Sequence, residues 1–338
     1  MNHVERFRAV MNFQPVDRLP RVEWAMWWDK TIQRWKSEGL PAQLRTVTDI
    51  LAYFALDPYC QFWIGTRDSA SVSSIHQRHE EGCVDNNDAY SKIKPSLFPN
   101  KPPLPPDHSD FQDMVPWSEK QQQGEAVVWI TLEGFFWFPR TLLGIERHLY
   151  AFYDQPELVH RINGDLTDYH IRMIKKIASI CRPTFMTFAE DMSYNHGPML
   201  SRELFYEFLA PYYRKVIPLL KELDIIPFVD TDGDATLMVP WLLDVGIRGV
   251  LPLERQAGVD AANLRQSFPQ LNMIGHFDKM VMDKGEDMIR RELERLLPAM
   301  RSGGFIPSVD HQTPPGISLA QYRSYLQLLG EYTLRAAR

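Results

Sequence analysis

The chain reads Ile-Ile-Pro-Phe-Val-Asp-Thr-Asp-Gly from residue 225 to residue 233. A run of apolar residues without alternation is typical of a strand that is covered on both faces, as in a parallel sheet between helices. The run ends in two carboxylates, Asp230 and Asp232, and then in Gly233, which permits a tight exit from the strand. The stretch therefore predicts a buried parallel strand that carries two acidic side chains at its carboxyl end.

Seven similar apolar runs are spread along the rest of the chain. They span residues 21–26, 59–64, 127–132, 185–189, 249–253, 272–275 and 304–308. Stretches with helical periodicity lie between them, such as 201–223, which Pro211 and Pro218 should kink or interrupt, and 286–300, which Gly303 and Gly304 should end. Eight strands that alternate with helices predict an α/β fold with a parallel sheet, either open and doubly wound or closed as a (β/α)8 TIM barrel.

Composition excludes several other classes of protein. The chain has 338 residues, of which 44% are hydrophobic and 24% charged, and this composition suffices for a large packed core. A formal net charge of -6 argues against a nucleic-acid partner, and no apolar run approaches the roughly 20 residues of a membrane span. The scattered Cys60, Cys83 and Cys181 predict free thiols, a cytoplasmic location and no zinc site built from cysteines.

Residues 67–124 interrupt the alternation of strands and helices. The segment is polar and rich in proline, most densely between residues 100 and 107. We expect one domain over residues 1–338, within which residues 67–124 form a surface insertion after the second strand, with a hairpin as one option. A lid is the functional alternative, because long loops in compact domains often cover active sites.

Seven of the eight predicted strands are followed by a carboxylate. Ligands bind at the carboxyl ends of the strands in parallel α/β folds, so these side chains should converge on one mouth. Like charges that converge repel one another unless a cation or shared protons lie between them. The acidic residues in question are Asp29, Glu133, Glu190, Asp191, Asp230, Asp232, Glu254, Asp278 and Asp310.

Asp230, Asp232 and His311 form the predicted metal site. Residues two apart in an extended strand end point to the same side, so both aspartates can face one ligand. His311 follows the last strand, which adjoins the first strand in a closed barrel. Carboxylate and imidazole ligands suit a harder divalent ion than thiolates do. Acid–base catalysis by the same groups without a metal is the alternative, because clustered carboxylates raise one another's pKa.

Other residues near the strand ends are candidates for proton transfer or substrate binding. The candidates for proton transfer or orientation are Glu190, Asp191, His276 and Asp278; those for substrate binding are Trp24, Trp27, Glu133, Tyr194, Glu254 and Asp310. His276 and Asp278 flank Phe277, either as a proton-shuttling pair or as a hydrogen-bonded strand end. The tryptophans and the aromatic residues 135–138 predict an aromatic-walled pocket for a flat or apolar substrate.

The chain resembles the uroporphyrinogen decarboxylase superfamily, which also contains cobalamin-dependent methyltransferases. The similar segments are residues 6–11, 15–20, 190–192, 196–201, 211–213, 229–233, 303–308 and 314–315. The resemblance covers nearly the whole chain and implies a closed (β/α)8 barrel. It also implies a small-molecule substrate and a homodimer.

The resemblance bears on cofactors and substrate as well. The methyltransferases bind zinc through a His-x-Cys pair and a later Cys, and these positions resemble Asp230, Asp232 and His311 here. The porphyrin decarboxylases carry an arginine-rich stretch for which this chain has only Arg21. The resemblance implies methyl or one-carbon transfer with a divalent metal, zinc or a harder ion, and a corrinoid carried by a partner protein. Decarboxylation of uroporphyrinogen or a smaller acid and a non-catalytic binding role are the alternatives.

Overall fold

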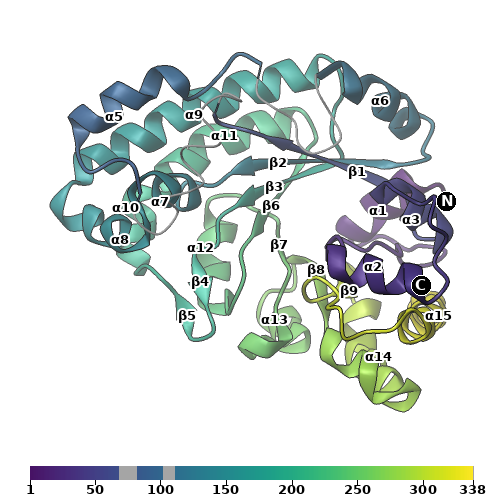
Figure 1. Cartoon of the computed structure of the whole chain (residues 1–338). Coiled ribbons are helices and arrows are strands. Elements are labelled where there is room, and N and C mark those ends of the chain that lie inside the picture. Colours follow the sequence, from purple (N-terminus) through teal and green to yellow (C-terminus); the bar gives the residue numbers. More distant parts are fainter. Residues whose placement is uncertain (68–81, 102–110, 338) are drawn as a thin grey trace.

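The computed structural model describes residues 1–67, 82–101 and 111–337. Seven parallel strands form one curled sheet in the order β1-β2-β3-β6-β7-β8-β9 (Figure 1). They are β1 (Tyr59–Ile64), β2 (Val127–Glu133), β3 (Phe185–Ala189), β6 (Ile226–Asp230), β7 (Gly249–Leu251), β8 (Asn272–Phe277) and β9 (Phe305–Val309). A separate antiparallel pair consists of β4 (Ser193–Tyr194) and β5 (Gly197–Pro198).

Helices lie between the strands in sequence and cover the outside of the sheet (Figure 1). They are α1 (His3–Met11), α2 (Asp29–Ser37), α3 (Val47–Tyr53), α5 (Asn87–Ile93), α6 (Met114–Gln122), α7 (Trp137–Leu143), α8 (Ile145–Asp154), α9 (Pro156–Ala178), α10 (Arg202–Phe208), α11 (Ala210–Glu222), α12 (Val239–Asp244), α13 (Ala261–Ser267), α14 (Glu286–Arg301) and α15 (Leu319–Arg335). Short 3-10 turns are η1 (Lys94–Ser96), η2 (Phe111–Asp113), η3 (Thr236–Met238), η4 (Arg255–Ala257) and η5 (Lys279–Lys284). The predicted α/β class with a parallel sheet is confirmed.

Residues 21–26, the first predicted strand, are irregular instead, whereas the other seven predicted strands are present. Side chains hold this segment in place of a backbone ladder. The Trp24 indole N–H donates to the Val309 carbonyl at 2.6 Å, and the Tyr59 hydroxyl donates to the Glu23 carbonyl at 2.7 Å. The segment therefore contacts both β9 and β1. Among the described residues, however, backbone hydrogen bonds join only seven strands into the sheet.

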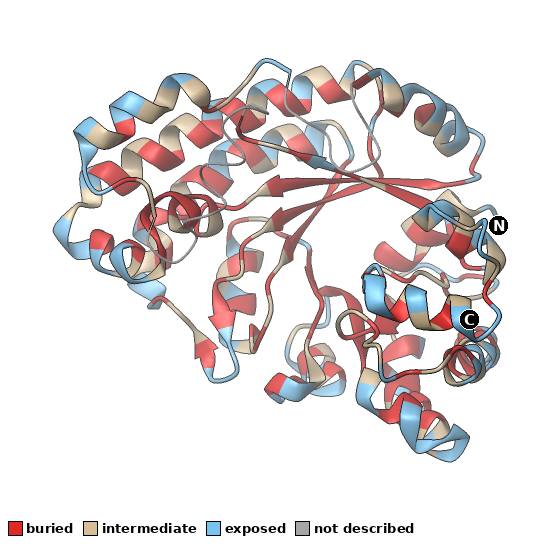
Figure 2. Cartoon of the chain, viewed as in Figure 1, coloured by how far each residue is buried: buried red, intermediate tan, exposed pale blue. Residues whose placement is uncertain are grey.

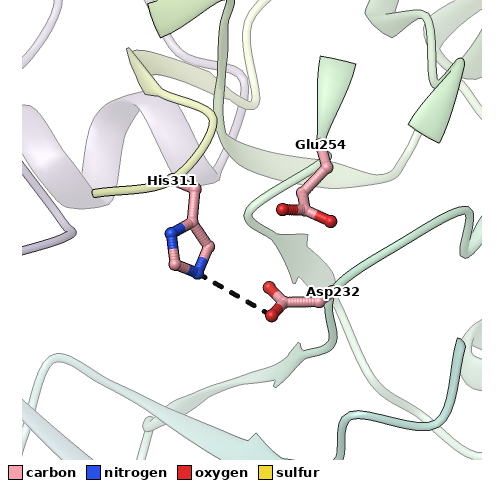
Figure 3. A group of neighbouring side chains, drawn as sticks. All are labelled: Asp232, Glu254 and His311. Carbon is pink, nitrogen blue, oxygen red and sulfur yellow. Dashed lines mark ion pairs between the residues drawn. The ribbon is translucent and has the colours of Figure 1, made fainter. Parts of the chain in front are cut away.

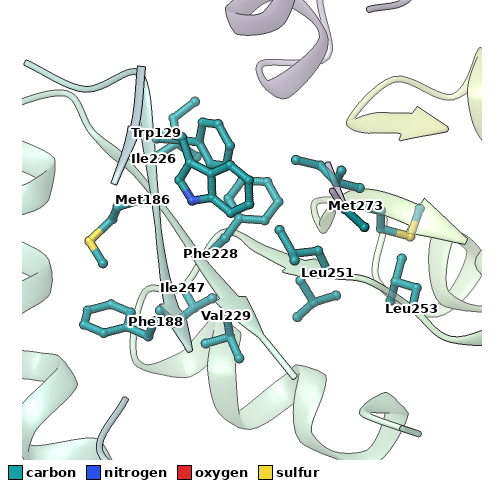
Figure 4. Packing of buried hydrophobic residues seen from close by; sticks show 14 of the residues in the cluster. Trp129, Met186, Phe188, Ile226, Phe228, Val229, Ile247, Leu251, Leu253 and Met273 are labelled. Atoms are coloured by element: carbon teal, nitrogen blue, oxygen red, sulfur yellow. The ribbon is translucent and has the colours of Figure 1, made fainter. Parts of the chain in front are cut away.

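The strands are buried along almost their whole length, as the uninterrupted apolar runs predict (Figure 2). Trp129 of β2 stacks on Phe185 of β3 with ring centroids 5.1 Å apart, and Phe7 of α1 stacks on Phe185 at 4.9 Å. Figure 4 shows Trp129 and Phe228 among the aliphatic side chains of neighbouring strands. Helix α1 thus supplies an aromatic ring that packs against the sheet and holds strands β2 and β3 in place.

Two of the predicted helix boundaries are confirmed. The stretch 201–223 divides into α10 and α11 at Leu209, two residues before Pro211, while Pro218 lies inside α11 without ending it. Helix α14 ends at Arg301, and Gly303 and Gly304 follow with φ values of +80° and +62°. Glycine adopts such values without strain, so the chain can turn sharply into β9.

The described part of residues 67–124 is helical apart from its connections. It contains α5, η1, η2 and α6, and an isolated bridge pairs Arg67 with Leu97. Most of the proline-rich stretch 100–107 lies outside the described residues. The boundaries 1–338 and 67–124 stay predictions. Among the described helices, none is both long and apolar enough to cross a bilayer.

Candidate functional site

A cavity of about 300 Å³ lies beside the carboxyl ends of the sheet strands. Its lining comprises Trp24, Ala25, Met26, Gln61, Trp63, Trp129, Trp137, Ala189, Asp191, Asp230, Asp232, His311 and Gln312. Strand register places Gln61 opposite Trp129, and Ala189 opposite Asp230, so these residues project from one face of the sheet. Four of the predicted polar residues, Asp191, Asp230, Asp232 and His311, therefore share one cavity wall.

Asp232, Glu254 and His311 form a compact group at this mouth. Each offers one ligand atom, and these atoms lie within 4.8 Å of one another (Figure 3). His311 Nε2 lies 3.7 Å from Asp232 Oδ2. The group contains two of the three predicted metal ligands, with Glu254 in the place expected for Asp230. Asp230 lines the same cavity but lies outside this compact group.

The loop after β6 is shaped by a glycine that no other residue replaces without strain. Gly233 has a φ of +79°, and a Cβ at this position would lie 2.6 Å from the Tyr194 backbone. Its N–H donates to Glu254 Oε2 at 2.8 Å, and the N–H of the next residue, Asp234, donates to the Tyr194 carbonyl at 2.9 Å. The loop after β6 is thereby fastened to β4 and to Glu254, which brings Asp232 and Glu254 together.

Burial, together with the neighbouring carboxylates of Asp191 and Glu254, raises the pKa of Asp232 to about 7. Burial also raises the pKa of Asp230 well above its ordinary value, with Asp191 and Asp232 acting in the same direction. Burial lowers the pKa of His311, which favours the neutral imidazole that binds metals. A cation placed among these groups would stabilise the ionised carboxylates, which burial and mutual repulsion disfavour.

Glu190, a predicted catalytic residue, lies outside the cavity lining. Its carboxylate accepts the backbone N–H groups of Phe135 at 2.8 Å and Phe136 at 2.7 Å, and the hydroxyl of Tyr213. A Cβ on Gly134 would lie 2.0 Å from the carboxyl carbon of Glu190, so the loop passes as close as glycine allows. Glu190 thus positions the loop after β2, including its cavity residue Trp137, which fits the orienting role among those predicted for it.

His276 and Asp278 both form hydrogen bonds with backbone groups near the strand end. The His276 ring bonds to the Leu253 carbonyl through Nδ1 at 2.8 Å and accepts the Ala261 N–H through Nε2 at 3.0 Å. Burial lowers its pKa to about 4, so the ring stays neutral. Asp278 accepts the Met280 N–H at 2.9 Å and thereby caps the N-terminus of η5. The structure favours the hydrogen-bonded strand end over the proton-shuttling pair.

Two of the predicted substrate-binding residues reach the site. Trp24 lines the cavity, and its ring meets that of His311 edge-on with centroids 6.2 Å apart. Glu254 belongs to the compact group. Trp27 instead packs in the core, with its ring 6.1 Å from Trp35 and nearly perpendicular to that of Tyr322.

The remaining three predicted substrate-binding residues contact protein groups elsewhere. Glu133 forms an ion pair with Arg67 at 3.0 Å. Asp310 is buried and pairs with Lys279 at 3.0 Å. Tyr194 stays exposed on β4, outside the cavity lining. None of these three side chains belongs to the cavity lining.

Several cavity residues were missed by the sequence reasoning. Gln61 and Trp63 lie two residues apart in β1, and both line the cavity. The Gln61 amide donates to Thr131 Oγ1 at 2.8 Å. A glutamine inside an otherwise apolar strand was the available signal. Trp129 points inward and donates to Thr187 Oγ1 at 2.9 Å. Of the predicted aromatic stretch 135–138, only Trp137 lines the cavity, because the three phenylalanines are fully buried.

Glu23 is a further buried acid near the site. It accepts the Ser308 hydroxyl at 2.8 Å and the Tyr322 hydroxyl at 2.9 Å, and so joins the segment 21–26 to β9 and α15. Burial raises its pKa to about 7. Glu23 directly precedes Trp24 in the sequence and lies outside the cavity lining. Its contacts therefore position the segment that carries Trp24.

Comparison with known proteins adds to this geometry. A solved methyltransferase from Methanosarcina mazei matches with a TM-score of 0.66 and 12% identity, over 98% of this chain and 99% of that chain. A candidate vitamin-B12-independent methionine synthase from Listeria monocytogenes has a TM-score of 0.47 and 10% identity, over 94% and 97% of the two chains. No curated protein sequence matches.

The model of the uroporphyrinogen decarboxylase (URO-D) family matches residues 131–332. This segment covers more than half of the chain and contains Asp191, Asp230 and all three members of the compact group. The likeness to the methyltransferase structure supports the same fold over nearly the whole length. The chain belongs to the uroporphyrinogen decarboxylase family.

Proposed function

We propose that the protein is an enzyme that transfers a methyl or other one-carbon group to or from a small substrate, with the help of a divalent metal ion. The observation that carries this proposal is the group of Asp232, Glu254 and His311, whose ligand atoms lie within 4.8 Å of one another at the cavity mouth. Family membership and the fold of the methyltransferase neighbour support it. A cavity of about 300 Å³ suits a small substrate.

The three residues fit a divalent ion by their chemistry. Two carboxylates and one imidazole form an oxygen and nitrogen donor set that suits zinc or a harder ion. The raised pKa of Asp232 also fits, because a bound cation would stabilise its ionised form. When bound, such an ion supplies Lewis acidity, which polarises a substrate atom or lowers the pKa of a bound group.

The other cavity residues have separate roles in this proposal. Asp191 lies beside Asp232 in the cavity lining, and the backbone of Asp232 favours the ionised form of its carboxyl group. No described residue donates a hydrogen bond to the Asp230 carboxylate, which leaves it available to hold or release a proton of the substrate. The indole rings along the wall exclude water from the reacting group.

We propose further that a corrinoid bound to a partner protein carries the methyl group. Such a partner would approach the cavity at Met26, an exposed apolar side chain of its lining. A cytoplasmic location and a homodimer belong to the same proposal. Residues 21–26 would close the sheet into a barrel as its eighth segment, since they form hydrogen bonds with both β9 and β1.

Decarboxylation of uroporphyrinogen is less well supported. The cavity lining contains three aspartates and, among the described residues, no lysine or arginine. The described part of this lining offers no cation to bind the carboxylates of a porphyrinogen. Arg21, the one arginine of the opening stretch, lies near Gly330 of α15, and not in the cavity lining.

The experiment that tests the proposal is an assay with zinc-loaded protein, methylcobalamin and a panel of small nucleophiles. We expect an acceptor-dependent loss of the methylcobalamin spectrum that Asp232→Asn and Glu254→Gln abolish. Asp278→Asn is the matched control, because Asp278 begins η5 outside the cavity and should retain the activity. Full activity in both cluster variants would contradict the proposal, as would carbon dioxide release from uroporphyrinogen without any methyl transfer.

A further inference from the structure

The cavity combines aromatic rings with negative charge. Four indoles, those of Trp24, Trp63, Trp129 and Trp137, share the lining with Asp191, Asp230 and Asp232. Among the described residues, no lysine or arginine belongs to this lining. An aromatic wall with acidic groups attracts a cation, because the faces of indole rings carry partial negative charge.

The indole N–H groups of two of these tryptophans are already used by the fold. Trp24 Nε1 donates to the Val309 carbonyl at 2.6 Å, and Trp129 Nε1 donates to Thr187 Oγ1 at 2.9 Å. Stacking of Trp129 on Phe185, at 5.1 Å between centroids, fixes that ring further. The wall therefore offers rigid ring surfaces to a ligand, and not hydrogen-bond donors.

The same wall already holds one cation of the chain. The guanidinium of Arg140 lies over the Trp137 ring, 5.1 Å from its centroid, and Arg140 donates to the Asp191 carbonyl at 3.1 Å. This contact occupies part of Trp137, and Trp129 is buried and stacked on Phe185, so Trp24 and Trp63 remain for a ligand. The pairing shows that an indole of this wall accepts a positive charge in the folded protein.

The negative charge in the cavity is only partly matched by nearby cations. Lys279 pairs with Asp310, and His311 lies against Asp232. The Asp230 carboxylate receives no hydrogen bond from a described residue. If a metal ion takes Asp232, Glu254 and His311, Asp230 still faces the cavity without a partner. A bound cation would stabilise the ionised form of Asp230, which burial otherwise disfavours, whereas a neutral or anionic ligand would not.

We propose that the substrate of this cavity is a methylated ammonium compound, bound against Trp24 and Trp63 with Asp230 as its counter-charge. A quaternary ammonium group has no N–H to satisfy and spreads its charge over methyl groups, which suits a wall of ring surfaces. The inference rests on the proposed function, in which such a compound is the methyl donor.

Binding is tested with choline and its neutral carbon isostere, 3,3-dimethylbutan-1-ol, by calorimetric titration of the zinc-loaded protein. We expect choline to bind about tenfold or more tightly than the alcohol, as a cation–π contribution requires. Trp63→Leu and Asp230→Asn should each weaken choline binding several-fold and leave binding of the alcohol nearly unchanged. Trp28→Leu is the matched control, because Trp28 is exposed and lies outside the lining.

Equal affinity for choline and the alcohol in the parent protein would overturn the inference, and this comparison needs no variant. Choline binding that Asp230→Asn leaves unchanged would also overturn it. Because the experiment measures binding, its failure can be distinguished from a failure of the proposed function. Choline binding without methyl transfer to or from cobalamin contradicts the function alone, whereas methyl transfer with a thiol and no choline binding contradicts the inference alone.

Discussion

At the scale of single residues, Asp232 should make the stability of the metal-free protein depend on pH. Burial raises its pKa to about 7 in the folded state, whereas an unfolded aspartate titrates near 3.9. The folded state thus binds an extra proton between these values, and the ionised carboxylate destabilises the fold at higher pH. Asp232→Asn removes this effect, so its stability relative to the parent should increase as pH rises from about 5 to about 8.

Urea unfolding of both proteins in the presence of a chelator measures this difference. The comparison of variant with parent cancels the contributions of groups that titrate alike in both, such as His170 and His276, whose pKa values burial lowers to about 4. A variant that loses stability relative to the parent over the same pH range would contradict the account. Saturating zinc should reverse the difference, because only the parent retains its full ligand set.

The hydrogen bonds of the Glu190 carboxylate should stabilise the folded protein. Replacement by Gln puts an amide NH2 where the carboxylate accepts N–H groups from Phe135 and Phe136. We expect Glu190→Gln to lose roughly 1–3 kcal/mol of unfolding free energy, because a buried donor is left unsatisfied. Tyr213→Phe removes one donor and keeps the carboxylate, so its loss should be smaller. Normal stability of Glu190→Gln together with lost activity would instead assign Glu190 a catalytic role.

At the scale of secondary-structure elements, the turn after β6 should require glycine at position 233. Gly233→Ala forces a Cβ to within 2.6 Å of the Tyr194 backbone at a φ of +79°. Gly258→Ala is the matched control, because Gly258 has a φ of +87° and no atom within 4 Å of the added Cβ. Both variants pay about 1–2 kcal/mol for the left-handed conformation, and Gly233→Ala pays more because of the clash.

Measurement of both glycine variants needs unfolding curves and zinc titrations. Gly233→Ala should also bind zinc more weakly, because Gly233 donates to Glu254 and lies beside Asp232. Gly258→Ala should bind zinc as the parent does. Equal stability losses with unchanged zinc affinity in both variants would show that the turn does not position the ligands.

Sequence reasoning at this scale predicted elements better than side-chain directions. The seven strands follow from apolar runs, because strands buried on both faces need few polar positions. Side-chain direction is harder to predict, since strict alternation holds only in extended backbone. His276 has a φ of +70° and Asp191 a φ of +40°, and such left-handed residues redirect the side chains beside them. No sequence pattern marked these two positions.

At the scale of the whole molecule, the curl of the sheet creates the candidate site. Strands β6 and β9 are separated in the sheet by β7 and β8, yet the residues that follow them meet, with His311 and Asp232 3.7 Å apart (Figures 1 and 3). Sequence could predict that carboxylates gather at one end of the strands. It could not predict that Glu254 joins the compact group, because this depends on the curvature of the sheet and on the Gly233 contact.

The central claim is that this convergence forms a metal site, and anomalous diffraction from zinc-soaked crystals tests it most directly. We predict one strong anomalous peak at the zinc edge within about 2.0–2.2 Å of an oxygen of Asp232, an oxygen of Glu254 and a nitrogen of His311. Crystals of Asp232→Asn should lose the peak. A map with no anomalous density between these three side chains, in crystals that bind zinc elsewhere, would contradict the account.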